Sequence, residues 1–244
     1  MSPNFDVNVH WPYRYVANFD ILGISSLLRN HKERALRMLL DFDDRKNLVG
    51  LMDIEIIETG EVIADQIARV SFSDTIVIFT KGNTIKDLWA IIALGSQLFS
   101  KCLNKCIPLR GGVAYGEFFF DPYREIFCGL PLVEAHEIGE EAQWLGIVVT
   151  EEVAKRCVQN NISTGQKPGI VEWDVPLKRE RSVRRGVINW PSVYRKNFTI
   201  TPPICVEQFY SPLEEDFGKY SELPEVIKKK YVNTVDFINK RLES

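Results

Sequence analysis

A mixed α/β domain is the fold that the sequence predicts, and three observations lead to it. Segments rich in aromatic and β-branched residues alternate along the chain with segments of helical periodicity. Two apolar segments flank Ser73-Asp74, which predicts a hairpin and so a mixed central sheet flanked by helices. The length of 244 residues fits one sizeable α/β domain, or one domain with an elaborated C-terminus.

The first predicted elements are a strand and two helical segments. Residues 13–21 (YRYVANFDI) predict a strand because aromatic and branched side chains dominate them. Leu22-Gly23-Ile24-Ser25-Ser26 then turns the chain into a helix. A long helix is predicted from residue 33 to about residue 58, because apolar residues recur there on one face: Leu36, Leu39, Leu40, Val49, Met52 and Ile56.

The middle of the chain predicts the rest of the sheet. Residues 66–72 and 75–80 form the hairpin, and Lys81-Gly82-Asn83-Thr84 breaks the chain before a helix over 85–103. Strands are predicted over 108–120, 125–128 and 147–149. Helices are predicted over 132–144 and over 151–158, the latter with Thr150 as its N-cap.

The character of the chain changes after residue 159. Two β-like stretches, 170–175 and 182–189, are followed by an irregular segment interrupted by prolines, and residues 224–242 predict a closing helix. We therefore divide the chain into a core over residues 1–158 and a C-terminal extension over 159–244, packed on the same domain.

Composition argues against nucleic acid and membrane as partners. The formal net charge is -3, from 30 basic and 33 acidic residues, which gives no global attraction for nucleic acid. No apolar run reaches the roughly 20 residues that cross a bilayer. The five cysteines are scattered and odd in number, and the N-terminus MSPNFD is not a secretory signal. We expect a cytoplasmic protein with free thiols.

Two aspartates are the candidate site residues. Asp20 ends a predicted buried strand and precedes a glycine turn and a helix, so its carboxylate lies beside free backbone N–H groups. Asp74 lies at the tip of the apolar hairpin. Either residue alone is explained as a helix cap or a turn former. Together, on neighbouring strand ends of one sheet, they are what a two-magnesium phosphoryl-transfer site needs.

In their order and spacing, these motifs resemble class III adenylyl and guanylyl cyclases. Strand-Asp20-Ile21-x-Gly23-hydrophobic-Ser25 resembles the first metal motif of that family, and Ser73-Asp74 its second metal aspartate. The strand LRGGVAYGE over 109–117, Cys128-Gly129, and LGIVVT over 145–150 resemble the segments that follow. The similarity covers about residues 13–158, roughly three fifths of the chain.

The resemblance implies a ferredoxin-like, palm-type cyclase domain and a two-metal reaction. Asp20, Asp74 and the carbonyl of Ile21 would hold two Mg²⁺ or Mn²⁺ ions in each site, with both aspartates catalytic. A nucleoside triphosphate would be converted to a 3′,5′-cyclic monophosphate and pyrophosphate. Because the active sites of the family lie between two such domains, a homodimer is implied. The residues that would bind substrate are Leu22, Gly23, Ile24, Ser25 and Phe72.

Four positions depart from the family pattern. Val70 and Ile126 stand where purine cyclases read the base with a lysine and an aspartate, and Val133 and Glu137 stand where the transition-state asparagine and arginine are expected. A purine edge facing apolar side chains would leave its hydrogen-bonding groups unpaired, which favours a pyrimidine base. Whether another arginine, such as Arg69 or Arg110, replaces the missing one stays open.

The C-terminal extension resembles a narrower group. Val187-Ile188-Asn189-Trp190-Pro191 and Lys230-Tyr231-Val232-Asn233-Thr234 are similar to antiphage pyrimidine cyclases of the Pycsar group. That likeness implies a role in antiphage defence and UTP ahead of CTP as substrate, with cUMP as the product. The alternative is a catalytically degenerate cyclase-like domain that binds nucleotide or a partner protein. A diguanylate-cyclase-like palm is disfavoured because the hairpin lacks a GG[DE]EF turn.

Overall fold

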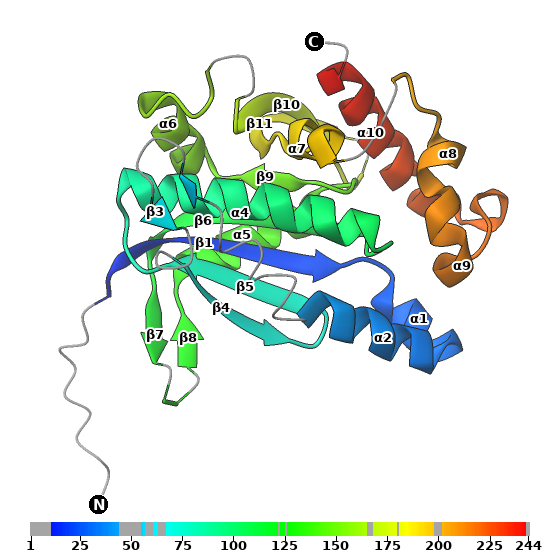
Figure 1. Cartoon of the computed structure of the whole chain (residues 1–244), viewed down its shortest axis with the longest axis horizontal. Helices are drawn as coiled ribbons and strands as arrows, with labels where there is room; N and C mark the ends of the chain where they lie inside the picture. Colours follow the sequence, from blue (N-terminus) through cyan, green and yellow to red (C-terminus); the bar gives the residue numbers. More distant parts are fainter. Residues whose placement is uncertain are drawn as a thin grey trace, which may run out of the picture.

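A seven-stranded mixed sheet forms the centre of the molecule, with strand order β10-β11-β9-β6-β1-β5-β4 (Figure 1). The computed structural model describes residues 11–43, 55–56, 61–62, 67–121, 123–124, 126–164, 168–179, 181–197 and 202–242. Helices lie on both faces of the sheet, and the predicted mixed α/β fold with a flanked central sheet is confirmed.

The central strand β1 lies between two antiparallel neighbours, β5 and β6, and β6 in turn pairs parallel with β9. The strands of the main sheet are β1 (Tyr13–Ile21), β4 (Ile67–Phe72), β5 (Thr75–Thr80), β6 (Leu109–Glu117), β9 (Ile147–Val149), β10 (Ile170–Leu177) and β11 (Arg181–Ile188). Two separate ribbons are β2 (Glu55–Ile56) with β3 (Glu61–Val62), and β7 (Phe119–Asp121) with β8 (Ile126–Cys128).

Helices α4 and α5 cover opposite faces of the sheet. Gly95 of α4 lies against the ring of Phe19, whereas α5 approaches Gly112 of β6 on the other face. The described helices are α1 (Ile24–Asn30), α2 (Lys32–Asp43), α4 (Ile85–Asn104), α5 (Leu130–Glu141), α6 (Glu151–Gln159), α7 (Trp190–Asn197), α8 (Val206–Tyr210), α9 (Glu214–Phe217) and α10 (Glu225–Leu242), with 3₁₀ turns at Ser211–Leu213 and Tyr220–Glu222.

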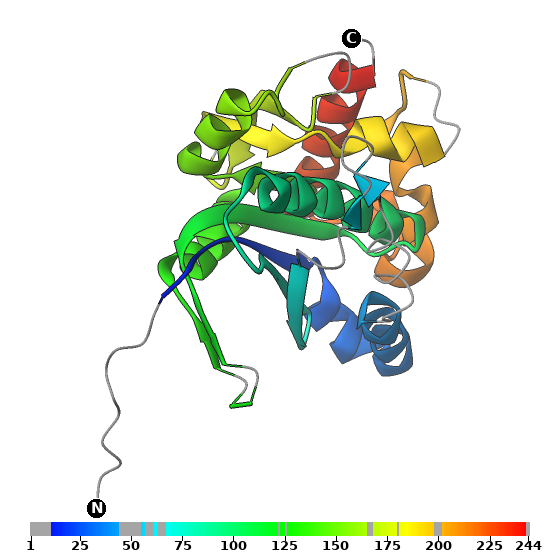
Figure 2. The same cartoon turned by 60° about the vertical axis from the view of Figure 1, so that its left-hand side comes forward.

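Side chains alternate between the two faces of the sheet along β1, and this alternation decides on which face Asp20 lies. Ala17, Phe19 and Ile21 point to the α4 side and join the main core. Val16 and Asp20 therefore point to the α5 side, where Val16 joins a smaller core with Val77, Phe79 and Phe118. This second core continues into the ribbon β7–β8, which projects from the body of the molecule as an arm (Figure 2).

The segment after residue 158 contributes to the same sheet and core. β11 joins β9 through the pair Val187–Val148. Helix α10 packs by Phe237, whose ring centroid lies 4.9 Å from that of Trp144 and 5.0 Å from that of Trp173. The division of the chain at residue 158 stays a prediction.

Some predicted elements differ from those in the structure. The long helix predicted from residue 33 to about residue 58 ends at Asp43, and Glu55–Ile56 is a strand; residues 44–54 and 57–58 lie outside the described residues. The strand predicted over 108–120 is interrupted at Phe118. Helix α7 was not predicted. Among the described helices, none is long and apolar enough to span a bilayer.

Candidate active site

The two candidate aspartates lie on neighbouring strands at one end of the sheet. Asp20 pairs in register with Thr75, the first residue of β5, and Asp74 immediately precedes that residue in the hairpin turn. The backbone N–H of Ile21 donates to the carbonyl of Asp74 at 3.0 Å. The sequence-based expectation that Asp20 and Asp74 come from adjacent strand ends is therefore met by the backbone.

Asp20 lies on the α5 face, opposite Arg110 of β6. Arg110 donates from Nη2 at 3.0 Å and from Nε at 3.2 Å to Oδ2 of Asp20. Burial raises the pKa of the Asp20 carboxyl, the Arg110 charge opposes this shift, and the nearby Asp74 charge adds to it. The mutual repulsion of the two carboxylates favours a cation between them.

A chain of ion pairs leads away from Asp20. The Nη2 of Arg110 also contacts Oε2 of Glu140 near the end of α5, and Lys178, which follows β10, contacts Oε1 of the same carboxylate. Arg110 further donates from Nη1 to the carbonyl of Glu140 at 3.3 Å. The Arg110 side chain is only 12% exposed, so this guanidinium is held between two carboxylates away from bulk water.

The turn after Asp20 offers backbone donors. The N–H of Leu22 is already bonded to the carbonyl of Pro108 at 2.8 Å, so it is not available to the phosphates as predicted. The N–H groups of Gly23, Ile24 and Ser25 make no hydrogen bond with another described residue. They are the unpaired donors that begin a helix, here α1.

Gly23 is required at this turn for two reasons. Its φ of 82° lies in the left-handed region that side chains disfavour. A Cβ at this position would also lie 2.9 Å from the ring of Phe217 in α9. The C-terminal segment therefore packs directly against the turn that follows Asp20.

Phe72 lies at the edge of an apolar surface beside the aspartates. Its side chain is 50% exposed, and its ring centroid lies 6.0 Å from that of Phe127 on β8. Val70 projects from the same face of β4 and packs on the second core. Ile126 precedes Phe127, so its side chain leaves the opposite face of the ribbon. Phe127 is therefore the residue of β8 that reaches Phe72.

The oxygen atoms at this site are suitable ligands for a hard divalent cation. Carboxylate and backbone carbonyl oxygens are the ligands that Mg²⁺ and Mn²⁺ prefer. The Asp74 carboxylate makes no hydrogen bond or ion pair with any described residue. Its charge contributes to the raised pKa of Asp20. Within the described ranges, no three His, Cys, Asp or Glu side chains gather as a metal site. Any metal would have to be held by the pair together with backbone or substrate oxygens.

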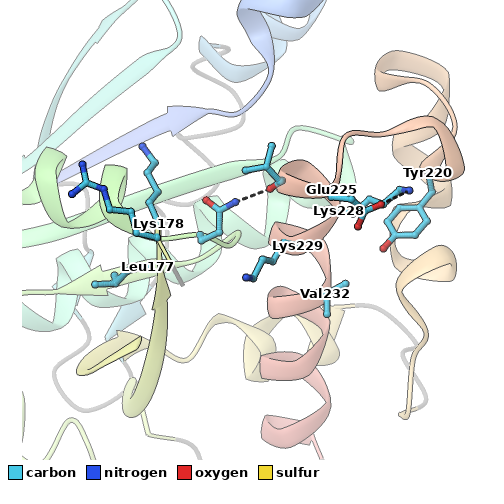
Figure 3. Close-up of a pocket in the computed structure, with 10 residues that line it drawn as sticks. Leu177, Lys178, Tyr220, Glu225, Lys228, Lys229 and Val232 are labelled. Carbon is cyan, nitrogen blue, oxygen red and sulfur yellow. Dashed lines mark hydrogen bonds and ion pairs between the residues drawn. The ribbon is translucent and has the colours of Figure 1, made fainter. Parts of the chain in front are cut away.

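A basic groove of about 520 Å³ lies next to the chain of ion pairs (Figure 3). Lys178 and Arg179 line it on one side, and Lys228 and Lys229 of α10 on the other. Lys178 thus borders the groove and also binds Glu140. Lys228 is paired with Glu225 at 3.0 Å.

Sequence reasoning assigned no role at this site to Glu140, Lys178, Lys230 or Phe127. Glu140 and Phe127 carried no local signal, since their positions depend on packing between α5, β6 and the β7–β8 arm. Lys230 did have a local signal in the sequence. It lies with Ile227, Tyr231 and Thr234 on the buried face of a predicted helix, where a lysine is unusual.

Comparisons with known proteins identify the fold. No protein-family model and no curated protein matches the sequence. The catalytic core of a rhodopsin-guanylyl cyclase with converted specificity, in complex with ATPαS, matches with a TM-score of 0.50 and 10% identity, over 73% of this chain and 95% of that chain. Adenylate cyclases from Trypanosoma brucei match with a TM-score of 0.49 and 11% identity, over 73% of this chain and 90% of that chain.

An adenylate/guanylate cyclase/hydrolase from Silicibacter pomeroyi matches with a TM-score of 0.48 and 12% identity, over 74% of this chain and 98% of that chain. At 10% identity the match to the guanylyl cyclase core speaks to the fold alone. The strand order, the two covered faces and the match to the guanylyl cyclase core agree with one another. The chain has the fold of a class III nucleotidyl cyclase catalytic domain.

Proposed function

We propose that this protein is a nucleotidyl cyclase that converts a nucleoside triphosphate to its 3′,5′-cyclic monophosphate and pyrophosphate. The observation that carries the proposal is the pairing of Asp20 and Asp74 at adjacent strand ends, close enough for one charge to raise the pKa of the other carboxyl. In the balanced reaction, the ribose 3′-oxygen bonds to the α-phosphorus, the bond to the β-phosphate oxygen breaks, and the hydroxyl proton is lost to water.

Asp20, Asp74 and the carbonyl of Ile21 would hold the divalent ions, Mg²⁺ or Mn²⁺. Two such ions supply Lewis-acid activation of the 3′-hydroxyl and neutralise the charge of the triphosphate. Before substrate binds, Arg110 holds the Asp20 side chain in position by its two hydrogen bonds. Glu140 offers Arg110 a second carboxylate, so Asp20 can give up this contact without leaving a buried unpaired guanidinium.

The chain's own donors would bind and orient the phosphates. The N–H groups of Gly23, Ile24 and Ser25 begin α1 and are the donors left unpaired at this turn. The Ser25 side chain is exposed beside them. Phosphoryl transfer depends chiefly on such positioning and on charge, rather than on covalent chemistry by the protein.

For the base, we propose a pyrimidine, with UTP ahead of CTP. Val70, Phe72 and Phe127 form an apolar surface next to the aspartates and offer no group to pair with a purine edge. The order of UTP and CTP rests only on the likeness of the C-terminal segment to Pycsar-type cyclases, as does a role in antiphage defence.

A nucleoside triphosphate substrate also suits the cytoplasmic location predicted from the sequence. We further propose that the active form is a homodimer.

The test is incubation of the purified protein with ATP, GTP, CTP and UTP in turn, with Mg²⁺ or Mn²⁺, and chromatography of the products. We expect cyclic product from UTP with the highest kcat/KM, and a loss of at least about a hundred-fold in Asp20→Asn and Asp74→Asn, as for removal of a group that stabilises charge in the transition state. Full activity of either variant would remove the site assignment. Preference for ATP or GTP would remove only the pyrimidine proposal.

A second candidate function is a degenerate cyclase fold that binds nucleotide without turning it over. Two observations favour it: Asp20 is engaged by Arg110, and Val133 and Glu137 stand where transition-state groups are expected. Measurable binding of a nucleoside triphosphate, with no cyclic product from any of the four, would select this function over catalysis.

A further inference from the structure

Lys230 of the C-terminal helix α10 faces the candidate active site. Three hydrogen bonds dock α10 on the segment that follows α5: Gln143 donates to the carbonyl of Val226 at 2.6 Å, Asn233 donates to the carbonyl of Gln143 at 2.7 Å, and the N–H of Leu145 donates to Thr234 at 2.8 Å. Residues 226, 230, 233 and 234 fall on one face of a helix. Lys230 therefore points toward the end of α5, where Glu140 lies.

The charges around Lys230 are those of the candidate site. The pKa of Lys230 is lowered to about 8, chiefly by burial and also by the charges of Arg110 and Lys178, while the charge of Asp20 opposes the shift. The ammonium group is half-buried and makes no hydrogen bond or ion pair with any described residue. Asp20, the carboxylate whose charge acts on Lys230, is already bonded to Arg110.

A half-buried ammonium that has no partner among the residues the structure describes, and that lies near two other cations, is unfavourable for the fold and favours binding of an anion. The described cluster contains three cations, Arg110, Lys178 and Lys230, and its three carboxylates are Asp20, Asp74 and Glu140. When Asp20 and Asp74 hold divalent ions, Glu140 still pairs with Arg110 and Lys178, and Lys230 is the cation left to meet a ligand. The divalent ions and Lys230 together favour a ligand that carries several negative charges and lies between β1 and α10.

We propose that Lys230 binds the phosphate chain of the nucleotide, so that the C-terminal segment supplies a cationic group to the active site formed by β1 and the β4–β5 turn. The assignment rests on the proposed function in taking a nucleoside triphosphate as the ligand. It also offers a donor for phosphate charge in a site where Glu137 occupies the expected arginine position. Lys230 reaches the site from a different element than that arginine would.

The experiment measures binding of inorganic tripolyphosphate, UTP and uridine to the full chain by calorimetry with Mn²⁺ present. Lys230→Gln removes the charge and keeps much of the side chain; we expect the Kd for tripolyphosphate to rise about ten-fold or more, as for loss of a charge-assisted hydrogen bond. The Kd for uridine is expected to stay unchanged. Lys230→Arg keeps the charge and is expected to restore most of the tripolyphosphate affinity.

The matched control is Lys240→Gln, which removes the same charge from an exposed position of α10 paired with Asp236 at 3.0 Å. It should bind all three ligands as the wild type does. The assignment would be overturned if Lys230→Gln bound tripolyphosphate as tightly as the wild type does. It would also be overturned if the wild type did not bind tripolyphosphate. An equal loss for uridine would overturn it too, because that indicates a general disturbance of the site.

The result also separates this inference from the proposed function. Tripolyphosphate binding that depends on Lys230, in a wild type that makes no cyclic product, would refute the cyclase activity and leave Lys230 as a phosphate ligand. Cyclic product from the wild type, with an unchanged KM in Lys230→Gln, would keep the activity and refute the role of Lys230.

Discussion

At the level of single residues, Asp20 and Lys230 are both held where their charged forms are disfavoured. Burial raises the pKa of Asp20 and lowers the pKa of Lys230 to about 8. Ionisable groups with strongly shifted pKa values gather at functional sites, because ligand binding compensates for an environment that folding alone does not favour. The two residues lie on different elements, β1 and α10, and are part of one cluster.

This placement predicts that Lys230 destabilises the free protein at neutral pH. Its pKa falls from 10.5 in the unfolded chain to about 8 in the folded one, so between these values the unfolded state binds more protons and stability rises with pH. Below pH 8 the full penalty is present. We expect Lys230→Met to raise the Tm at pH 7, by about 2–4 °C for each kcal/mol gained.

The gain should shrink as the pH is raised from 8 toward 10.5, because the folded-state lysine is then neutral and the cost of removing the proton from the unfolded-state lysine falls as the pH nears 10.5. Thermal unfolding of both proteins across this range measures the difference, and other titrating groups cancel between them. A Met variant less stable than the wild type at pH 7 would mean that Lys230 has a stabilising partner in the folded state.

The candidate residues were predictable where the backbone alone sets their position. Asp20 and Asp74 follow from the strand pattern, because the end of β1 and the β4–β5 turn must meet if the strands pair antiparallel. The engagement of the Leu22 N–H with Pro108 was not predictable, since it depends on how the chain enters β6. Glu140 likewise reaches Arg110 only through the close packing of α5 on β6.

At the level of elements, β1 and the hairpin were predicted correctly because their apolar pattern and their turn agree. The helix predicted from 33 to about 58 failed at Glu55–Ile56, because Ile56, which is spaced to suit the apolar face of that helix, belongs instead to a ribbon. Helix α7 was missed because Pro191 was treated as a breaker. It lies in the first turn of that helix, where a missing N–H is harmless.

The position of α5 depends on a glycine in β6. A Cβ on Gly112 would lie 2.1 Å from the carbonyl oxygen of Ala135 and 2.6 Å from the side chain of Ile138. Since a carbonyl inside a helix cannot move alone, we expect Gly112→Ala to push α5 away from the sheet. The cost should be about 1–3 kcal/mol, as for overpacking of a core, together with reduced binding of nucleotide because Glu140 moves with the helix.

Guanidinium denaturation with a nucleotide-binding measurement tests this. Gly116→Ala is the matched control, because it lies on the same strand and faces the same helix, but its Cβ would lie 3.3 Å from Pro131. It should cost much less. Equal stability of the two variants would mean that α5 is not held by close approach at Gly112.

At the level of the whole molecule, the two faces of the sheet are unequally covered. α4 closes one face with the main core. On the other face α5 covers β6, and the smaller core of Val16, Val77, Phe79 and Phe118 leads into the projecting β7–β8 arm. Large apolar side chains stay exposed around this side, with Phe72 at 50% and Ile126 at 46%. Exposed apolar surface of this kind marks interaction sites.

We expect a second copy of the chain to cover this face in solution. Val133 of α5 is 51% exposed, beside Leu132, which packs on the smaller core. A charge at Val133 would be buried without a partner in the dimer and hydrated in the monomer, so Val133→Glu should dissociate it. Light scattering should give a mass near twice 28.1 kDa for the wild type and 28.1 kDa for the variant.

Loss of cyclase activity should accompany the loss of the dimer, because a second copy would enclose Asp20 and Asp74 from water and supply groups that one chain lacks. The matched control is Val158→Glu, since Val158 of α6 is 59% exposed and lies on another part of the molecule. It should leave both the mass and the activity as in the wild type. A wild type that is monomeric at micromolar concentration and fully active would refute the dimer, because all groups needed for the reaction would then come from one chain.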